Sequence, residues 1–308
     1  MGLDIIGDVH GHADALEALL RRLGYRLRDG AWRHSDRTAV FVGDLIDRGP
    51  AQLRTVDLVR RMVDAGAARC VMGNHEYNAI AWHTPDPWHP GEHLRRHNHR
   101  HRSQHHAFLA EVEDRPRLHD EIVGWFRTLP LWLELEGCRV IHACWDENHM
   151  EALRPHLNAD GSLGRDALER SMPKSAHPEH QAIEVLLKGP EARLPEGLSF
   201  HDKDGNHRKE VRLAWWNGER TFRAAALRMP GLDVASIPDA PLPDGARPRV
   251  GPGGPVFFGH YWMHGRPAEL GERFACVDYS AGHGEPLVAY RWDGEPALDS
   301  GKFLTSAG

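Results

Sequence analysis

The amino-acid sequence predicts an α/β fold built around an open sheet with parallel strands. In the first quarter of the chain, short apolar runs alternate with longer stretches whose apolar residues recur at helical spacing. This order favours parallel pairing, because each helix carries the chain back over the sheet. The chain has 308 residues and is 41% hydrophobic, and a chain of this length buries ~75% of its unfolded surface. A sizeable core is therefore expected.

Three strands and two helices are expected in this first part. The apolar run at 3–7 and the β-branched run at 38–42 predict buried strands, and 68–72 predicts a third. The stretch at 14–23 predicts an amphipathic helix, because its leucines fall three and four positions apart. A second helix is expected over 52–65 on the same grounds.

We expect one domain over residues 1–308, with two departures from the sheet. Residues 83–130 are rich in Pro, His and Arg and predict an insert, either a cap or a long loop. Helical stretches are expected within it at 107–112 and 121–128. Residues 189–250 are punctuated by Pro and Gly and predict an irregular excursion.

Further elements are expected along the second half of the chain. They are strands at 131–135, 139–142, 210–216, 256–260, 274–279 and 287–292, a helix at 148–173 and a linker at 241–255. Trp215 and Trp216 are neighbours in the strand expected at 210–216, so they should point to opposite faces of the sheet.

Charge and cysteine content narrow the range of partners and compartments. The net charge of -6 gives no general attraction to nucleic acid or to an anionic membrane. No apolar run approaches the ~18 residues that a membrane span needs. The four cysteines form no Cys-x-x-Cys pair, and the first residues show no secretory pattern. We therefore expect a cytoplasmic protein with no membrane partner and no strong case for nucleic acid.

Six polar residues stand directly after predicted strands. In open α/β sheets, sites form at the carboxyl ends of strands, so these side chains should lie close together. Two carboxylates, three imidazoles and one amide oxygen form a mixed set that suits Mn, Fe or Zn. A carboxylate that bridges two ions would place them ~3.5–4 Å apart. The six candidates are Asp8, His10, Asp44, Asn74, His142 and His260.

Five short motifs, in this order, carry a resemblance to a known family. They are Gly7-Asp8-Val9-His10-Gly11, Gly43-Asp44-Leu45-Ile46-Asp47-Arg48-Gly49, Gly73-Asn74-His75-Glu76, Ile141-His142-Ala143 and Gly259-His260. The sequence resembles the calcineurin-like metallophosphoesterases and, within them, the bacterial members of the phosphoprotein phosphatase branch. The resemblance is strongest over residues 5–76. It implies a central β-sandwich flanked by helices, with two divalent metal ions at its mouth.

The resemblance also implies a role for each matching residue. For the metals, Asp8 and His10 would hold the first ion, Asp44 would bridge, and Asn74, His142 and His260 would hold the second. His75 would protonate the leaving oxygen, Asp47 would hold its proton in place, and Arg48 would bind the phosphate. Trp262 stands where the wider superfamily often has a second histidine, a departure that fits the phosphatase branch.

The implied reaction is hydrolysis of phosphate monoesters by attack of a metal-bound hydroxide. Two ions would lower the pKa of a bridging water and neutralise the phosphoryl oxygens. Mn is the ion expected in vitro, with Fe, Zn and Ni as alternatives. Family members usually bring a second arginine to the phosphate. Besides Arg48 and Asn74, the candidates for phosphate contact are Arg212, Arg223 and Lys188, each of which could equally be a solvated surface cation.

The segment at 83–106 holds eight histidines and several arginines directly after the third motif. One interpretation is a basic cap that recognises a polyanionic substrate, with Trp82 and Trp88 available to stack on bases. A second is binding of additional metal, and a third is a solvated, partly helical face. All three interpretations stay open, because the sequence places the segment near the site but does not indicate its function.

Four functions remain in order of preference. The first is a phosphatase of monoesters, whose substrate is a phosphorylated small molecule, a nucleotide or a phosphoprotein. The second is a pyrophosphohydrolase of diadenosine polyphosphates, since the tail at 276–282 is loosely similar to bacterial members with that activity. A nucleic-acid end phosphatase or phosphodiesterase ranks third because of the negative net charge. An inactive relative that binds partners ranks last, since all the motif residues are intact.

Overall fold

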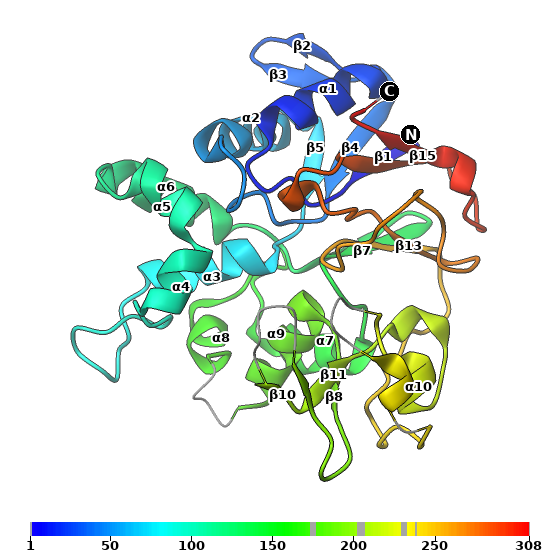
Figure 1. Ribbon diagram of the computed structural model, residues 1–308. Helices are drawn as coiled ribbons and strands as arrows, with labels where there is room; N and C mark the ends of the chain where they lie inside the picture. Colours follow the sequence, from blue (N-terminus) through cyan, green and yellow to red (C-terminus); the bar gives the residue numbers. More distant parts are fainter. Residues whose placement is uncertain (1, 173–176, 202–206, 229–232, 238, 308) are drawn as a thin grey trace.

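The computed structural model describes residues 2–172, 177–201, 207–228, 233–237 and 239–307. Two β-sheets lie face to face at its centre, with helices on their outer sides (Figure 1). The first sheet holds, in spatial order, β15 (Phe303–Thr305), β14 (Val288–Trp292), β1 (Gly2–Ile6), β4 (Arg37–Phe41) and β5 (Ala68–Cys70). The second holds β13 (Phe274–Cys276), β12 (Val256–Phe258), β7 (Cys138–Ile141) and β6 (Trp132–Leu135).

The first sheet has the parallel core that the sequence predicted. β1 pairs in parallel with β4, and β4 pairs in parallel with β5. The connections contain α1 (Ala13–Leu23) and α2 (Gln52–Asp64), which lie over this sheet (Figure 1). β14 runs antiparallel to β1, so the sheet as a whole is mixed.

Alternation along the strands gives each sheet two apolar faces. Ile5 of β1 belongs to the core that lies between the sheets, together with Val140 and Phe257 of the second sheet. Its neighbour Ile6 belongs to the core shared with α1 and α2, because successive side chains point to opposite faces. Leu19 of α1 is buried in that same core. The α/β sandwich flanked by helices is therefore confirmed.

The helix expected at 148–173 is wrong as a single element. α7 (Glu147–Leu153) runs into a 3₁₀ turn at Arg154–His156, and α8 (Arg165–Arg170) begins only after a loop. Pro155 occupies this turn, where it removes a backbone donor that a continuing helix needs. α9 (Pro178–Lys188) then packs against α7 below the second sheet (Figure 1). Pro173, the last residue of the expected helix, lies outside the described residues.

The strand expected at 210–216 ends early. β11 (Glu210–Arg212) pairs with β8 (Glu191–Arg193), and a 3₁₀ turn follows at Trp215–Asn217. The expectation that Trp215 and Trp216 occupy opposite faces of a strand is therefore wrong. The turn buries the Trp215 indole in the core and lets its Nε1 donate to the Ala143 carbonyl, 3.1 Å away.

The remaining elements are short. They are β2 (Arg26–Arg28), β3 (Ala31–Arg33), β9 (Phe200–His201), β10 (His207–Arg208), α10 (Phe222–Ala225) and 3₁₀ turns at Val234–Ser236, Ala281–His283 and Ser300–Lys302. Val211, Phe222 and Ile237 form a separate small apolar cluster in the excursion at 189–250, part of which lies outside the described residues. Across the described ranges, no helix is long and apolar enough to cross a membrane.

The segment after β5 forms a helical layer along one side of the sandwich (Figure 1). Its helices are α3 (Asn74–His83), α4 (His99–Gln104), α5 (His106–Val112) and α6 (Pro116–Phe126). Glu111 of α5 accepts hydrogen bonds from the backbone N–H groups of Gln52 and Leu53, at 2.7 and 3.0 Å. This carboxylate thereby satisfies two free donors at the start of α2 and ties the helical layer to the first sheet.

A buried carboxylate ties three neighbouring strands together. Asp4 of β1 is fully buried, and each of its oxygens accepts from Arg37 Nε at 3.0 Å. Arg291 Nε lies 3.1 Å from the same carboxylate. Since Arg37 belongs to β4 and Arg291 to β14, the carboxylate joins β1 to both of its neighbours.

Replacing Asp4 with alanine should lower the free energy of unfolding by about 3 kcal/mol, because it leaves two guanidinium groups without their shared partner. Urea unfolding at pH 7 measures the change. The matched control is Asp57→Ala, which breaks an exposed pair with Arg61 on α2 and should leave the unfolding midpoint almost unchanged. Equal losses in the two variants would contradict a role for the buried network.

Candidate active site

The six candidate metal ligands lie at the same end of the sandwich, although they come from both sheets. Each follows the carboxyl end of a strand, which is the edge where the sequence predicted a site. Their order is Asp8 and His10 after β1, Asp44 after β4, Asn74 after β5, His142 after β7 and His260 after β12. Stacking the two sheets therefore joins two half-sites that lie far apart in the sequence.

The carboxylate of Asp44 is the centre of this cluster. Its Oδ2 lies 3.7 Å from His10 Nε2, 3.5 Å from His142 Nε2 and 3.9 Å from His75 Nε2. One set of potential ligand atoms joins Asp44 to His142 and His260 within 4.8 Å. A second set joins it to His10 and His75 within the same distance. Asp44 thus has the geometry of a ligand shared by two adjacent sites.

Two of the histidines are held in the tautomer that a metal ligand requires. His10 Nδ1 donates to the Ile46 carbonyl and His142 Nδ1 donates to the Val42 carbonyl, both at 2.8 Å. Each Nε2 therefore keeps a free lone pair, and each lies within 3.7 Å of Asp44 Oδ2. Burial lowers the pKa of His10 to about 3 and also lowers the pKa of His142, so both rings are neutral at pH 7.

Two buried atoms of the cluster have no hydrogen-bond partner among the described residues. They are Asp8 Oδ1 and His10 Nε2. The other oxygen of Asp8 accepts from the His260 backbone N–H at 3.0 Å. Burial, and then the carboxylates of Asp278 and Asp44, raise the pKa of Asp8. A buried carboxylate oxygen and a buried imidazole nitrogen without donors are the groups that a divalent cation stabilises, so the residues fit a metal site.

The backbone at the site is strained. Left-handed φ angles occur at His10 (46°), Asp44 (49°), Asp47 (69°), Arg48 (74°) and His260 (73°). Within the described ranges, only three other non-glycine residues share this conformation. Each such residue costs of order 1–3 kcal/mol and persists only when its surroundings fix it. Strain concentrated on five predicted site residues indicates that the loops are shaped for the site.

A buried glutamate fixes the loops that carry Asp44 and His75. Glu76 accepts hydrogen bonds from the backbone N–H groups of Asp44, Leu45 and Gly73, at 2.8, 2.8 and 3.0 Å. Burial, and then repulsion from Asp44, raise the pKa of Glu76 to about 7. A Cβ atom at Gly73 would lie 2.3 Å from both the backbone nitrogen and Oδ1 of Asp44, so only glycine fits between the two loops.

His75 and Asp47 form a close pair beside the metal ligands. His75 Nδ1 lies 2.6 Å from Asp47 Oδ2, and Asp47 Oδ1 lies 3.0 Å from Nδ1 of His105. Burial alone would raise the pKa of Asp47, but His105 and His75 outweigh it and the pKa falls below its usual range. Burial would also lower the pKa of His75, but Asp44 and Asp47 raise it above its ordinary value. The pair therefore favours a protonated His75 next to an ionised Asp47.

Arg48 stands exposed at the mouth of the site. Its guanidinium carbon lies 4.3 Å from the centre of the Trp262 ring, and its Nη1 lies 3.3 Å from His283 Nε2. Along the described chain, Arg48 forms no ion pair with a carboxylate. Stacking on Trp262 fixes the plane of the guanidinium while its N–H edge stays available to an anion.

The structure brings two of the three additional phosphate candidates to the site. Arg212 Nη1 lies 3.2 Å from His260 Nε2, and Lys188 lines the same cavity while paired with Glu184. Burial, and then Arg212, lower the pKa of His260. Arg223 is not brought there, because it lies on α10 and donates to the Ile237 carbonyl at 2.7 Å.

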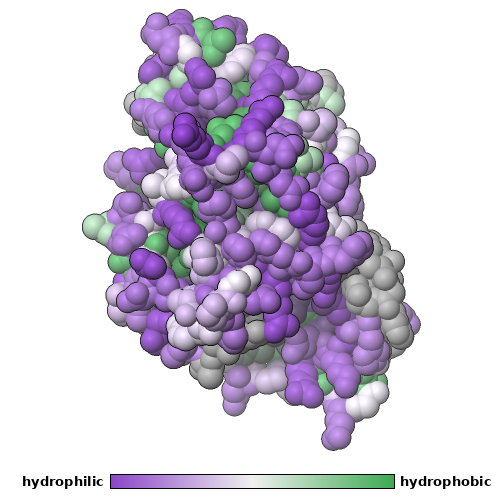
Figure 2. Space-filling model, turned by 90° about the vertical axis from the view of Figure 1, so that its left-hand side faces the viewer, coloured by the Kyte–Doolittle hydropathy of each residue, from purple (hydrophilic) through white to green (hydrophobic). Residues whose placement is uncertain are grey.

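A cavity of about 1890 Å³ opens in front of the cluster. Asp44, Arg48 and His75 line it from the first half of the chain, and Lys188 and Arg212 line it from the second half. The insert contributes a long stretch of wall from Asp86 to Ala107, in which histidines and arginines predominate. On the side of the molecule that carries the insert, the surface is largely hydrophilic with small scattered apolar patches (Figure 2).

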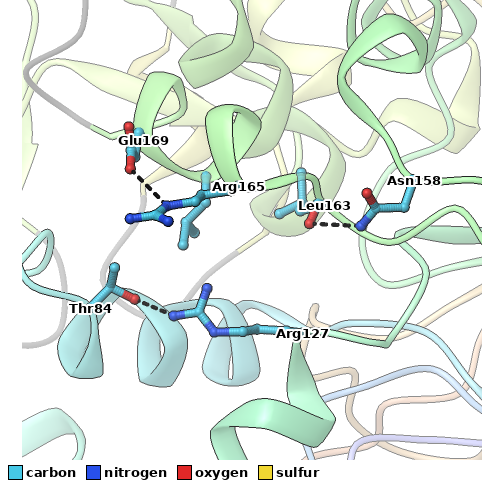
Figure 3. A pocket seen from close by; sticks show the side chains of 7 residues that line it. Thr84, Arg127, Asn158, Leu163, Arg165 and Glu169 are labelled. Carbon is cyan, nitrogen blue, oxygen red and sulfur yellow. Dashed lines mark hydrogen bonds and ion pairs between the residues drawn. The ribbon is translucent and has the colours of Figure 1, made fainter.

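A second, smaller cavity of about 420 Å³ lies between α8 and the end of α6 (Figure 3). Arg127 donates to Thr84 Oγ1 at 2.6 Å, and Arg165 pairs with Glu169 at 3.7 Å. Its two arginines are thus already occupied by neighbouring side chains. None of the candidate ligands lines this cavity, so it is distinct from the site centred on Asp44.

Sequence reasoning missed three residues that shape the site. Glu76 was part of a quoted motif but received no role, and Asp278 lay in a tail that was noted only for its similarity. Asp278 accepts from the backbone N–H groups of Trp262 and Ser280, at 2.7 and 3.0 Å. His105 was hidden among the histidines of the insert. A carboxylate in an apolar run is a usable signal for Asp278, but no local signal separates His105 from its neighbours.

Comparison with known proteins places this chain in a family. The family model of calcineurin-like phosphoesterases matches residues 1–184, which is more than half of the chain. The bis(5'-nucleosyl)-tetraphosphatase PrpE (asymmetrical) of Halalkalibacterium halodurans is 50% identical over 76 residues, covering 24% of this chain and 31% of that protein. The protein of the same name from Oceanobacillus iheyensis is 47% identical over 76 residues, covering 24% and 30%. The matches thus span less than a third of these relatives.

A likeness to solved structures extends over the whole chain and concerns the fold alone. A point mutant of a cold-active protein tyrosine phosphatase is 16% identical, with a TM-score of 0.50, and the match covers 99% of this chain and 80% of that one. The family match and the candidate metal ligands agree with a hydrolase that acts on phosphate esters. The chain belongs to the calcineurin-like phosphoesterase family.

Proposed function

We propose that this chain is a metal-dependent hydrolase of phosphate monoesters. The observation that carries the proposal is the close pair of His75 and Asp47 directly beside the cluster centred on Asp44. An imidazole whose Nδ1 is held by a carboxylate can offer its Nε2 proton to a leaving oxygen. Phosphate monoesters need both this proton and a strong local positive charge, since the leaving oxygen is basic and the phosphoryl group is anionic.

The residues that would hold two divalent ions follow from the cluster. Following the family motifs, we assign Asp8 and His10 to the first ion, Asn74, His142 and His260 to the second, and Asp44 to both. The unpartnered oxygen of Asp8 and the contact of Asn74 with His142 support this, and His75, which also lies within reach of His10 and Asp44, is kept for the proton. When bound, such ions supply Lewis-acid charge to the phosphoryl oxygens and lower the pKa of water. Manganese is the proposed ion in vitro, because mixed carboxylate, imidazole and amide ligands suit it, with Fe, Zn and Ni as alternatives.

The other side chains bind substrate and move one proton. Arg48, held flat by Trp262, and Arg212, next to His260, bind the phosphoryl oxygens. His75 gives its Nε2 proton to the leaving oxygen, while Asp47 holds the Nδ1 proton. Lys188 forms a close ion pair with Glu184, whereas Arg212 is 3.4 Å from Glu191 and keeps its other terminal nitrogen next to His260, so we rank Lys188 below the arginines for phosphate contact. Asn74 Oδ1 lies 3.1 Å from His142 Nε2 and is ranked below them as well.

Hydrolysis of a dinucleoside polyphosphate is the second candidate function. Two observations favour it, namely the size of the cavity and the similarity to relatives from Bacillus and related genera that are named bis(5'-nucleosyl)-tetraphosphatase. A monoester of modest size would fill little of about 1890 Å³. The exposed Trp88 and the ring of Trp262 line the same cavity and could stack on a base.

A reducing compartment fits the four cysteines. All of them are buried and free, and burial raises the pKa of Cys70, Cys144 and Cys276. Such thiols behave as small core residues and not as redox pairs. We therefore propose the cytoplasm as the location.

The two candidate functions differ in the products they form. The manganese-loaded chain is offered p-nitrophenyl phosphate and diadenosine tetraphosphate at equal concentration, and the products are separated by anion exchange. Faster release of p-nitrophenol supports the monoesterase. Preferred cleavage of the dinucleotide, to two ADP or to ATP and AMP, would replace it with the second candidate. No turnover of either substrate, with two ions bound, would overturn both.

Replacing His75 with alanine should slow hydrolysis of phenyl phosphate by about 10²–10⁴-fold, because its basic leaving oxygen needs a proton. The loss for p-nitrophenyl phosphate should be smaller, since p-nitrophenolate leaves without one. Metal content should stay at two ions per chain, because His75 is assigned to the proton and not to a metal.

His99→Ala, an exposed histidine of the insert outside the cavity, is the matched control and should leave both rates unchanged. A fall in bound metal for His75→Ala would contradict its role as the acid and make it a ligand.

Replacing Asp44 with asparagine should remove most of the bound metal, because Asp44 is shared by both sites. Binding to the folded state alone raises stability, by about 4 kcal/mol when free metal is at 1,000 times its dissociation constant. Manganese should therefore raise the thermal unfolding temperature of the wild-type chain but not that of Asp44→Asn. Mass spectrometry gives the stoichiometry, and the exposed Asp14→Asn serves as control. An equal rise in both proteins would disprove the assignment.

A further inference from the structure

Three arginines of the insert line the main cavity without a carboxylate partner. They are Arg95, Arg96 and Arg100, all in the stretch that follows α3 or begins α4. No ion pair joins any of the three to an acidic residue in the described part of the chain. By contrast, Arg102 of the same insert does not line the cavity and pairs with Glu113 at 2.7 Å.

Most of the carboxylates in the cavity wall are already engaged. Asp86 pairs with His89, Glu184 with Lys188, Glu191 with Arg212, and Asp47 with His75 and His105. The charges of these acidic groups are therefore balanced locally. Glu92 also lines the cavity, but none of the three arginines lies within ion-pair distance of it or of another carboxylate among the described residues.

Arg95 is the most enclosed of these arginines. Its Nη1 donates to Asn78 Oδ1 at 2.6 Å and its Nη2 donates to Gln104 Oε1 at 2.8 Å, while its buried Nε has no partner. Burial lowers the pKa of Arg95, and the more distant carboxylates of Asp47 and Glu184 only partly offset this. A partly buried guanidinium held by two neutral amides is oriented but not neutralised, which is unfavourable unless an anion completes the site.

The position of Arg95 relates it to the leaving group. Asn78 lies on α3, three and four residues after His75 and Asn74, so it occupies the next turn on the same side of the helix. Arg95 thus binds a side chain that lies about one helical turn, ~5 Å, beyond His75 on α3. In the proposed reaction His75 protonates the leaving oxygen, so a leaving group that extends from His75 along α3 would pass Arg95.

We propose that Arg95 forms a second phosphate subsite, which binds the leaving-group phosphates of a substrate with a linear phosphate chain. The inference rests on the second candidate function, hydrolysis within a phosphate chain, and on the proposed role of His75, which defines the side that the leaving group occupies. Asn78 and Gln104 hold the guanidinium fork in place, so its unused donors meet phosphate oxygens with little loss of side-chain freedom. Arg96 and Arg100 extend the same cationic wall toward solvent. The cationic wall then selects substrates by the number of phosphates in their phosphate chain.

Binding to the metal-free full-length chain tests this subsite without any turnover. The probes are orthophosphate and inorganic tripolyphosphate, with EDTA present, and calorimetry gives both dissociation constants. The wild-type chain should bind tripolyphosphate at least about tenfold more tightly than orthophosphate, since each charge-assisted hydrogen bond to phosphate adds roughly that factor. In Arg95→Gln this preference should fall by about tenfold, whereas Arg102→Gln should keep it.

The outcomes separate the inference from the proposed function. If the chain hydrolyses phosphate esters but Arg95→Gln and Arg102→Gln keep the same preference, the subsite is disproved and the proposed function stands. If no ester is hydrolysed but the preference for tripolyphosphate depends on Arg95, the phosphate subsite is supported and the proposed function is disproved. If Arg95→Gln does not fold, the test rests on the wild-type chain. Equal dissociation constants for orthophosphate and tripolyphosphate would then overturn the subsite. ATP as a third probe distinguishes a nucleotide from an inorganic chain of the same three phosphates, since only a site that also contacts the nucleoside would bind ATP more tightly than tripolyphosphate.

Discussion

The crowding of buried carboxylates at the mouth of the sandwich is the constraint on which the rest of the site depends. Asp8, Asp44, Glu76 and Asp278 are all almost inaccessible to solvent. Burial, followed by repulsion among them, raises the pKa of Glu76 to about 7 and burial raises that of Asp278 to about 6. Such groups can stay together only where backbone N–H groups, imidazoles and cations surround them. The shape of the neighbouring loops follows from this requirement.

The two sheets meet the requirement by directing the ends of their strands toward one place. Left-handed turns at His10, Asp44 and His260 reverse the chain directly after β1, β4 and β12. The reversal aims side chains inward and leaves backbone N–H groups pointing at the carboxylates, as His260 does at Asp8. These turns are costly in isolation, so they are stable only because the packed sandwich fixes both flanks of each loop. Fold and site therefore stabilise each other, and a loose sandwich would lose the site before it lost its strands.

The sequence was sufficient for features that depend on local patterns and insufficient for features that depend on distant contacts. The parallel strands around Ile5 and Val40 and the helix around Leu19 follow from hydrophobic periodicity, which is a local property. The end of the strand near Trp215 was missed because a buried carbonyl across the core, and not the local pattern, decides where that indole points. His105 was missed for the same reason, since its contact with Asp47 spans 58 residues. The clustering of the candidate ligands at the ends of strands could be expected, because it depends on where the strands end.

The structure of the insert was the hardest to predict from the sequence, yet the insert contacts the loop and helix after β4, which the sequence predicted well. Glu111 binds the start of α2, and His105 binds Asp47, the partner of the proposed acid. Because both contacts reach the loop after β4 and its following helix, displacement of the insert would expose Asp47 and leave its carboxylate with one imidazole in place of two. The orientation of His75 depends on that carboxylate. The insert therefore supports the Asp47–His75 pair, the proposed acid, and also forms a wall of the cavity.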